Sequence, residues 1–267
     1  MAKNKNLETE KLARLNILVM NLKGGVGKTT TSSIVASFYV GSKLIEIDKI
    51  NESDKRIISS YYKSEQMDFT SATSENWLNF EDELFADGVK IIDVGAVKLE
   101  TFHNAMQMNK GYEEIDLIVI PNMDGADDFL VAEKFLANLK NVGFDTSKVL
   151  FVFSRFNPNE YTVSEQFNKF FRNADLLKED YQIDLEDENN YAVIPDKKCV
   201  KYARDKGITV RSLIENDDRD LRIQITDCED LEQKRELQEL RNCVINAKDL
   251  YSNYLHKLIQ KIQKKVS

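Results

Sequence analysis

The chain has 267 residues, of which 42% are hydrophobic, and this is enough apolar material for one large α/β domain. Its formal net charge is −8, which disfavours a protein that coats nucleic acid with a generally basic surface. The three cysteines are widely spaced without a C-x-x-C pattern, and only two histidines are present. Zinc or redox motifs and a Ser-His-Asp triad are therefore not expected.

The predicted elements alternate along the chain. Short apolar runs indicate strands, and helical patterns lie between them, which is typical of an α/β fold with a mostly parallel twisted sheet flanked by helices. The predicted strands are 15–20, 44–47, 89–94, 117–120, 149–153 and 191–194. The predicted helices are 29–39, 126–139, 162–171 and 197–206.

Other stretches define the expected domain organisation. Residues 51–87 and the acidic stretch 176–190 show no clear pattern, and we expect both to be solvated excursions from the core. Leucine, valine and tyrosine recur every seven residues from Leu237 to Leu258, which predicts a long amphipathic C-terminal helix or helix pair within 228–267. We predict a single domain over 1–267, with its core at about 15–215.

The cellular location is predicted from what the sequence lacks. The first residues, MAKNKNLETEKLAR, are polar, and no run of about 18 apolar residues occurs. We therefore expect a cytoplasmic protein.

A glycine-rich turn follows the first strand in the stretch NILVMNLKGGVGKTT, residues 16–30. Glycine lets backbone N–H groups converge on an anion, and the following helix presents its positive N-terminal end. A purely structural turn would explain the glycines but not the lysine and threonines where the helix begins, so we predict ATP and Mg²⁺ as cofactors. The predicted cofactor-binding residues of the turn are Gly24, Gly25, Val26, Gly27, Lys28, Thr29 and Thr30.

Each polar side chain of this turn has an expected role. Lys28 would reach the β- and γ-phosphates, and the Thr29 hydroxyl would ligate Mg²⁺. Thr30 would add a hydrogen bond to the α-phosphate.

One departure from the ordinary phosphate loop is informative. The pattern G-x-x-x-x-G-K-[ST] requires glycine where Leu22 stands, and a second lysine, Lys23, precedes the glycines. KGGVGKTT resembles the deviant Walker A motif of the ParA/MinD group of ATPases. The resemblance implies a P-loop NTPase fold and an ATP-dependent homodimer in which Lys23 reaches the partner's nucleotide. A residue larger than glycine at Leu22 favours the ParA partition branch.

Two aspartates at strand ends extend the resemblance. In LIEIDKI, Asp48 matches the residue that positions the attacking water in this group, although Lys49 and Ile50 depart from its pattern. In VKIIDVG, Asp93 matches the residue that holds Mg²⁺ through water. The resemblance thus implies Lys23, Lys28 and Asp48 as catalytic residues, and Thr29 and Asp93 as the metal site. Aspartate after a buried strand also commonly caps a turn or helix, so that alternative remains open.

The segment AVIPDKKCVKYARDKGITV is similar to the part of the group that follows its last core strand. The resemblance implies that the backbone at Pro195 and Asp196 lies against the adenine of the nucleotide. It implies the same for the strand end near 154–157.

The chain has two local clusters of basic residues. The C-terminal segment YLHKLIQKIQKKVS carries Lys257, Lys261, Lys264 and Lys265 and no acid. In order of preference, this segment packs on the core, contacts DNA phosphates non-specifically, or lies on an anionic membrane. The second cluster favours DNA and consists of Lys197, Lys198, Lys201, Arg204, Lys206 and Arg211.

These observations predict a Mg²⁺-ATP-dependent dimerising ATPase that acts in plasmid or chromosome partition or positioning. We expect no helix-turn-helix domain before the first strand, so a separate centromere-binding or adaptor protein would be required. That partner would stimulate a weak intrinsic hydrolysis of ATP to ADP and phosphate. The alternatives are a nucleotide-gated scaffold or adaptor in conjugation or polar positioning, and a MinD-like positioning ATPase at the membrane.

Overall fold

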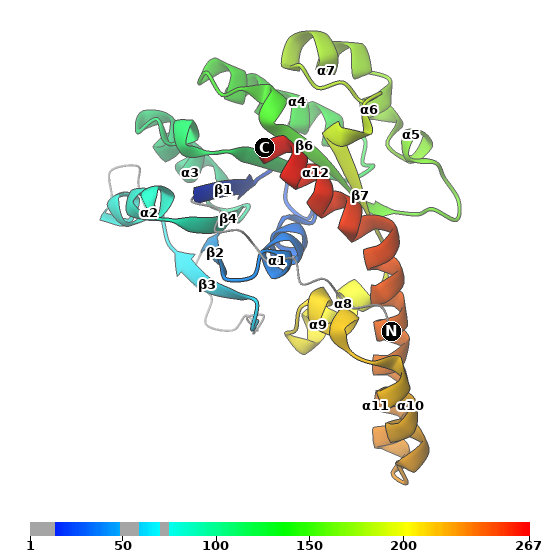
Figure 1. The fold of residues 1–267 in the computed structure, drawn as a ribbon. Helices are drawn as coiled ribbons and strands as arrows, with labels where there is room; N and C mark the ends of the chain where they lie inside the picture. Colours follow the sequence, from blue (N-terminus) through cyan, green and yellow to red (C-terminus); the bar gives the residue numbers. More distant parts are fainter. Residues whose placement is uncertain (1–13, 49–58, 70–74) are drawn as a thin grey trace.

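The computed structural model describes residues 14–48, 59–69 and 75–267, which form a twisted sheet with helices on both faces (Figure 1). Its strands are all parallel, in the order β3-β2-β4-β1-β5-β6-β7. The predicted fold class, an α/β sheet flanked by helices with a helical C-terminal stretch, is therefore confirmed. The strands are β1 (Arg14–Val19), β2 (Ser42–Ile47), β3 (Tyr62–Met67), β4 (Gly88–Val94), β5 (Leu117–Asn122), β6 (Val149–Phe156) and β7 (Tyr191–Pro195).

The helices divide between two apolar clusters, one on each face of the sheet. Successive residues of β1 alternate between them: Leu18 joins one cluster, and Ile17 and Val19 join the other. The first face is covered by α2 (Glu75–Phe85), α3 (Leu99–Met108), α4 (Asp128–Asn141), α5 (Val163–Gln166), α6 (Asn168–Phe171) and α7 (Ala174–Tyr181). The second is covered by α1 (Lys28–Phe38), α8 (Lys198–Lys206), α9 (Val210–Glu215), α10 (Asp218–Asp227), α11 (Leu231–Leu250) and α12 (His256–Val266).

Short 3₁₀ and π turns complete the described secondary structure. The 3₁₀ turns are η1 (Gly111–Glu114), η2 (Thr146–Lys148) and η3 (Glu188–Asn190). The π-helical turn is η4 (Tyr251–Leu255).

The stretch 51–87 is not a solvated excursion, so that expectation is wrong. It contains β3, which pairs with β2 along its whole length, and α2, which buries Trp77, Phe80 and Leu84. Its polar composition has a physical cause, since β3 is an edge strand whose central residues face water. Within this stretch, residues 51–58 and 70–74 lie outside the described part of the chain.

The acidic stretch 176–190 is also part of the core, contrary to expectation. Leu177, Tyr181, Ile183 and Leu185 are buried in the first apolar cluster. The acidic residues between them are mostly exposed, which masked the buried positions in the sequence pattern.

The C-terminal region contains one continuous helix. α11, η4 and α12 follow one another without a break, and η4 inserts a π turn into the α-helical ladder. Leu255, Leu258 and Ile262 are fully buried against the body of the protein, whereas the α10–α11 hairpin extends away from it (Figure 1). The predicted long amphipathic helix is thus present, and its last turns pack on the core.

Candidate functional site

The turn between β1 and α1 has a backbone that favours glycine. Gly25 has a φ of 75° and Gly27 a φ of 94°, both in the left-handed region. Gly27 is the N-cap of α1 and has no side chain that could accept from the N–H groups of the first helical turn. The N–H groups of that turn, together with the positive end of the helix, therefore suit an anion.

The amino group of Lys28 lies inside this turn. Its Nζ donates to the carbonyl oxygens of Lys23 at 2.7 Å and of Asn21 at 3.2 Å. Burial lowers the pKa of Lys28, while the carboxylates of Asp93 and Asp48 raise it. Lys28 is thus a buried ammonium group within reach of two carboxylates, and a phosphate oxygen can replace its carbonyl partners.

Asp93 lies near the carboxyl end of β4 and is buried. Burial raises the pKa of Asp93 to about 6, and the hydroxyls of Thr29 and Ser32 oppose this shift. Among the described residues, nothing donates a hydrogen bond to its Oδ1, although this atom is buried. A buried carboxylate oxygen without a donor, close to the Thr29 hydroxyl, fits the hard oxygen ligands that Mg²⁺ requires.

Asp48 follows the end of β2 and lies directly against Gly95. A Cβ atom added at Gly95 would fall 2.3 Å from Asp48 Cγ, so only glycine leaves room for the carboxylate. The Gly95 N–H also donates to the Ile47 carbonyl at 2.8 Å. The structure therefore brings Asp48, Asp93 and Lys28 together, although their roles remain predictions. Lys49 and Ile50 lie outside the described residues.

Lys23 makes an ion pair within the chain. Its Nζ lies 2.7 Å from Oδ2 of Asp128, the first residue of α4; the Asp128 side chain is 1% exposed and that of Lys23 is 36% exposed. A Cβ at Gly125 would fall 2.2 Å from the same oxygen and 3.1 Å from Lys23 Nζ. Lys23 is therefore held beside the loop that joins β5 to α4.

Asn21 and Asp128 shape the turn, and we did not predict either as a site residue. The Asn21 amide donates to the Pro121 carbonyl at 2.7 Å, and its Oδ1 accepts the Lys23 N–H at 2.9 Å. Both residues act on partners about 100 positions away in the sequence. No local pattern in a single sequence contains that information.

Pro195 and Asp196 lie at the carboxyl end of β7, which in the sheet order is the strand furthest from β2 and β4, the strands whose ends carry Asp48 and Asp93. Pro195 is buried and pairs with Phe156 of β6, whose carbonyl accepts the Asp196 N–H at 3.2 Å. In the described part of the chain, no hydrogen bond joins either residue to the glycine-rich turn. Contact with the turn comes instead through β6, since a Cβ at Gly27 would lie 3.1 Å from Ser154 Oγ.

Comparison with known proteins places this geometry in a known fold. The chain superposes on pnob8 ParA with a TM-score of 0.53 at 15% identity, over 94% of this chain and 99% of that one. The fold is that of the ParA-type ATPases. A plasmid partition protein of Borrelia burgdorferi bound to AMPPNP gives a TM-score of 0.50 at 13% identity, over 87% and 98% of the two chains. Apo McdA of Cyanothece gives 0.50 at 14% identity, over 88% and 99%.

No protein-family model and no curated protein matches the sequence. At these identities the structural likeness shows the fold alone. The predicted resemblance to the ParA/MinD group is therefore confirmed as a likeness of structure.

The basic C-terminal segment of this ParA-type fold is partly used in packing. Lys265 Nζ donates to the Ser147 carbonyl and to Asn190 Oδ1, both at 2.6 Å. Lys261 Nζ donates to the Tyr191 carbonyl at 2.8 Å. Lys257 and Lys264 are exposed.

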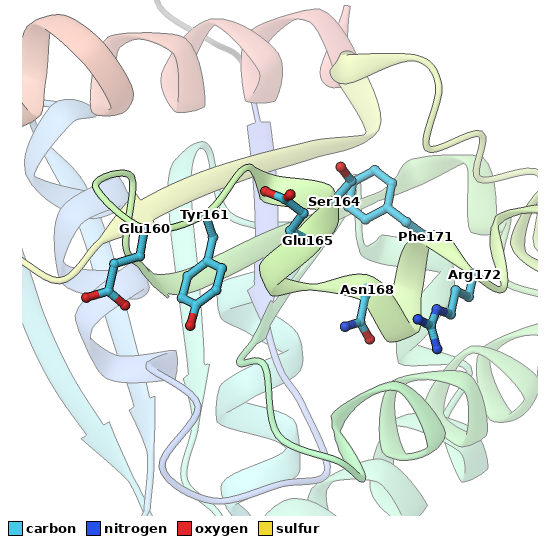
Figure 2. Close-up of a pocket in the computed structure, with 7 residues that line it drawn as sticks. All are labelled: Glu160, Tyr161, Ser164, Glu165, Asn168, Phe171 and Arg172. Atoms are coloured by element: carbon cyan, nitrogen blue, oxygen red, sulfur yellow. The ribbon is translucent and has the colours of Figure 1, made fainter.

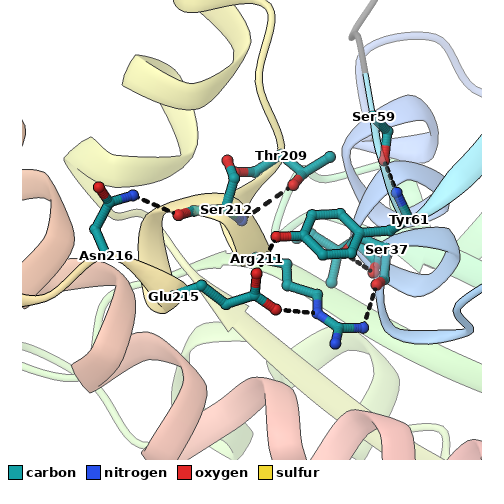
Figure 3. Close-up of polar contacts among 9 residues, drawn as sticks. Ser37, Ser59, Tyr61, Thr209, Arg211, Ser212, Glu215 and Asn216 are labelled. Carbon is teal, nitrogen blue, oxygen red and sulfur yellow. Dashed lines mark hydrogen bonds and ion pairs between the residues drawn. The ribbon is translucent and has the colours of Figure 1, made fainter.

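Internal contacts also occupy some of the basic side chains of the second cluster, so fewer of them are available to DNA. Arg211 donates to the Ser37 carbonyl at 2.8 Å and to Glu215 at 2.9 Å, and its guanidinium lies 4.5 Å from the Tyr61 ring centre (Figure 3). Lys197 pairs with Asp249 at 3.0 Å. The contacts of Arg211 join α9 to α1 and to the residue before β3, so Arg211 has a structural role.

A shallow depression of about 630 Å³ lies over α5 and α6, away from the glycine-rich turn (Figure 2). None of the predicted site residues lines it. Its lining residues are Glu160, Tyr161, Ser164, Glu165, Asn168, Phe171 and Arg172. Among the described residues, no helix is both long enough and apolar enough to cross a membrane.

Proposed function

We propose that this chain is a single-domain, Mg²⁺-dependent ATPase that dimerises on ATP and acts in the partition or positioning of a plasmid or chromosome. The observation that carries the proposal is the convergence of Lys28, Asp48 and Asp93 on the left-handed glycine turn. Its ParA-type fold supports it, as does the AMPPNP bound to the Borrelia partition protein.

The phosphates would bind in the turn formed by Gly24, Gly25, Val26 and Gly27 and the start of α1. Backbone N–H groups there would receive the phosphate oxygens, with Thr30 adding a hydroxyl at the α-phosphate. Lys28 would exchange its two carbonyl partners for β- and γ-phosphate oxygens. Pro195 and Asp196 would border the base.

Thr29 and Asp93 would hold Mg²⁺, Thr29 directly and Asp93 through water. The ion supplies positive charge that neutralises the phosphates as the γ-phosphoryl group leaves. The Asp93 carboxylate has the required environment, since it is buried with an oxygen that lacks a donor among the described residues.

Hydrolysis would proceed by in-line attack of water on the γ-phosphorus, releasing ADP and phosphate. Asp48 would accept a hydrogen bond from that water and orient it, while Lys28 stabilises charge on the phosphate oxygens. Lys23 would leave Asp128 and contact the nucleotide of the second subunit.

The partner would be a separate centromere-binding or adaptor protein that stimulates slow turnover. The exposed Lys257 and Lys264, with the exposed lysines of α8, would offer non-specific contacts to DNA phosphates. We propose a cytoplasmic location.

The test combines ATP binding by calorimetry, phosphate release and light scattering, each with MgCl₂. The parent chain is expected to bind ATP, to form a dimer with it and to release phosphate slowly. Gly95→Ala is expected to displace the Asp48 carboxylate and to lower turnover by about 100-fold, with ATP binding retained. Asp48→Ala is expected to give the same loss while the ATP dimer persists. A parent chain that fails to bind Mg²⁺-ATP would refute the proposal.

A further inference from the structure

Helix α2 has an exposed face on which acidic and large apolar side chains alternate. The residues of this face are Glu75, Leu78, Asp82 and Phe85, and their spacing of three and four residues places them along one side of the helix. All four are exposed, with 61% of Leu78 and 56% of Phe85 accessible to water. We call this row of four residues the α2 stripe.

The packing of α2 on the sheet does not use the α2 stripe. The opposite side of the helix buries Trp77, Phe80 and Leu84, which belong to the first apolar cluster. The rings of Trp77 and Phe80 pack edge-on against Phe69, with ring centres 6.4 and 5.5 Å apart. The core therefore accounts for the inner side of α2 and leaves the apolar residues of the stripe without a role in it.

The charge of this helix has one sign. Residues 75–87 contain five acidic residues and no lysine or arginine. Among the described residues, Glu83 is the member of this set that forms an ion pair, with Lys43 at 2.7 Å. Asp82 lies in the last turn, which has no basic residue and where the negative end of the helix dipole disfavours a carboxylate. The stability of the helix thus does not explain Asp82.

The aromatic ring of the stripe already has a cation beside it. The guanidinium carbon of Arg14 lies 5.9 Å from the centre of the Phe85 ring. A positive charge near an aromatic face is attracted by the electrons of the ring. The α2 stripe therefore offers two carboxylates and a ring to positively charged groups, together with the apolar surface of Leu78.

These charges decide between the possible occupants of the stripe. The carboxylates would repel DNA, anionic lipid and the same stripe of a second copy, but they would attract a basic protein segment. The stripe is about 15 Å long, which corresponds to about three turns of a partner helix. An amphipathic helix can present basic and apolar side chains along one face at this spacing.

We propose that the α2 stripe is the docking surface for a basic amphipathic helix of a separate protein. Lysine or arginine side chains of that helix pair with Glu75 and Asp82, and its apolar side chains cover Leu78 and Phe85. This docking requires neither ATP nor the ATP dimer, so it goes beyond the proposed function.

The probe for this surface is a fluorescent peptide of lysine, leucine and alanine, about 15 residues long, with lysine and leucine alternating along one helical face. Fluorescence anisotropy measures its affinity. The parent chain should bind it, and combining Leu78→Ser with Phe85→Ser should weaken binding about tenfold, because two apolar contacts are lost. The matched control combines Ile223→Ser with Leu231→Ser, two exposed residues of the α10–α11 hairpin, and should bind like the parent chain.

A second variant tests the charges of the stripe. Asp82→Asn should weaken peptide binding about threefold at low salt and have little effect at high salt. The parent chain should not bind a peptide in which glutamate replaces lysine.

Two results would overturn the proposal directly: a parent chain that does not bind the lysine peptide, and an equal loss in the α2 and hairpin variants. Weaker binding of the α2 variants to duplex DNA or anionic vesicles would also overturn it. So would a dimer that the parent chain forms without ATP and the α2 variants do not form, because the stripe would then belong to a second copy. Failure of the parent chain to bind Mg²⁺-ATP would instead refute the proposed function and leave the peptide measurement unaffected.

Discussion

The glycine-rich turn and the C-terminal helix α12 each contain a lysine that is withdrawn from water, Lys28 buried and Lys265 half-buried. Lys28 Nζ donates to two backbone carbonyls, and Lys265 Nζ donates to a carbonyl and a side-chain amide oxygen. Burial lowers the pKa of both lysines. By hydrogen bonding and titration alone, the two sites look alike.

Their surroundings differ, and the difference shows what distinguishes a binding lysine from a packing lysine. Lys28 lies at a helix N-terminus, next to left-handed glycines and within electrostatic reach of the carboxylates of Asp93 and Asp48. Lys265 lies in the last turn of α12, where it fastens the helix to η2 and η3. Burial of a lysine therefore does not identify a site unless the backbone around it can also receive an anion.

The largest expected effect is the loss of ATP affinity on replacing Lys28, the binding lysine of the pair. Lys28→Ala should weaken Mg²⁺-ATP binding by about 30-fold or more, because a charged contact to phosphate is typically worth about 2–5 kcal/mol. Calorimetry measures this directly. Lys265→Ala serves as the control and should bind ATP like the parent chain. Undiminished ATP affinity in Lys28→Ala would rule out the phosphate-loop assignment.

The next largest effect is expected on the ATP-dependent dimer when Lys23 is replaced. Lys23→Ala should keep monomeric ATP binding, since Lys28 and the glycine backbone remain, but should weaken the ATP dimer by about 2–5 kcal/mol. Light scattering with ATP and Mg²⁺ reports the dimer, and Asp48→Ala is the contrasting variant that should remain dimeric. If Lys23→Ala dimerises as well as the parent chain, Lys23 does not act across the interface.

Replacing Lys265 tests whether this lysine stabilises the packing of α12. Lys265→Met leaves the Ser147 carbonyl and Asn190 Oδ1 without this donor, which should cost about 1–3 kcal/mol of folding free energy. The midpoint of urea unfolding should fall accordingly, while ATP affinity stays constant. Lys257→Met, at an exposed position of the same helix, should leave the midpoint almost unchanged. An equal response from both variants would contradict the packing role of Lys265.

The smallest expected effect concerns DNA. If α12 contacts duplex phosphates, the exposed Lys257 and Lys264 should carry the contact. Replacing both by glutamine should reduce the log–log salt dependence of binding by about 1.8, or about 0.9 for each lysine. Fluorescence anisotropy over a salt series measures the slope. Replacing Lys261 and Lys265 instead should leave it nearly unchanged, and the opposite pattern would move the contact to the inner side of the helix.

The central part of the fold could be predicted because its signals are local. All six predicted strands are present, since a buried parallel strand contains an unbroken apolar run such as residues 117–120 of β5. The glycine turn was equally clear, since Gly25 and Gly27 adopt the left-handed conformations that require glycine.

The other parts of the fold and of the candidate site depend on contacts between residues that are distant in the sequence. β3 is polar because it is an edge strand, and Leu177 and Ile183 are buried within a stretch dominated by acids. Asn21 and Asp128 are ordinary polar residues until the fold brings Pro121 and Lys23 beside them. A single sequence contains no pattern for such pairs, so these parts of the candidate site became visible only in three dimensions.

The π-helical turn at Tyr251–Leu255 also determines the direction of the α10–α11 hairpin. A π turn holds one more residue than an α turn, and each helical residue corresponds to a rotation of about 100°. Deleting one residue from this turn would therefore rotate α11 about the helix axis relative to α12, and the buried face of α11, which contains Val244 and Ala247, would lose its place while Leu258 and Ile262 stay seated. The one additional residue of the π turn thus lets α11 and α12, two segments of a single helix, present their apolar faces to the same cluster.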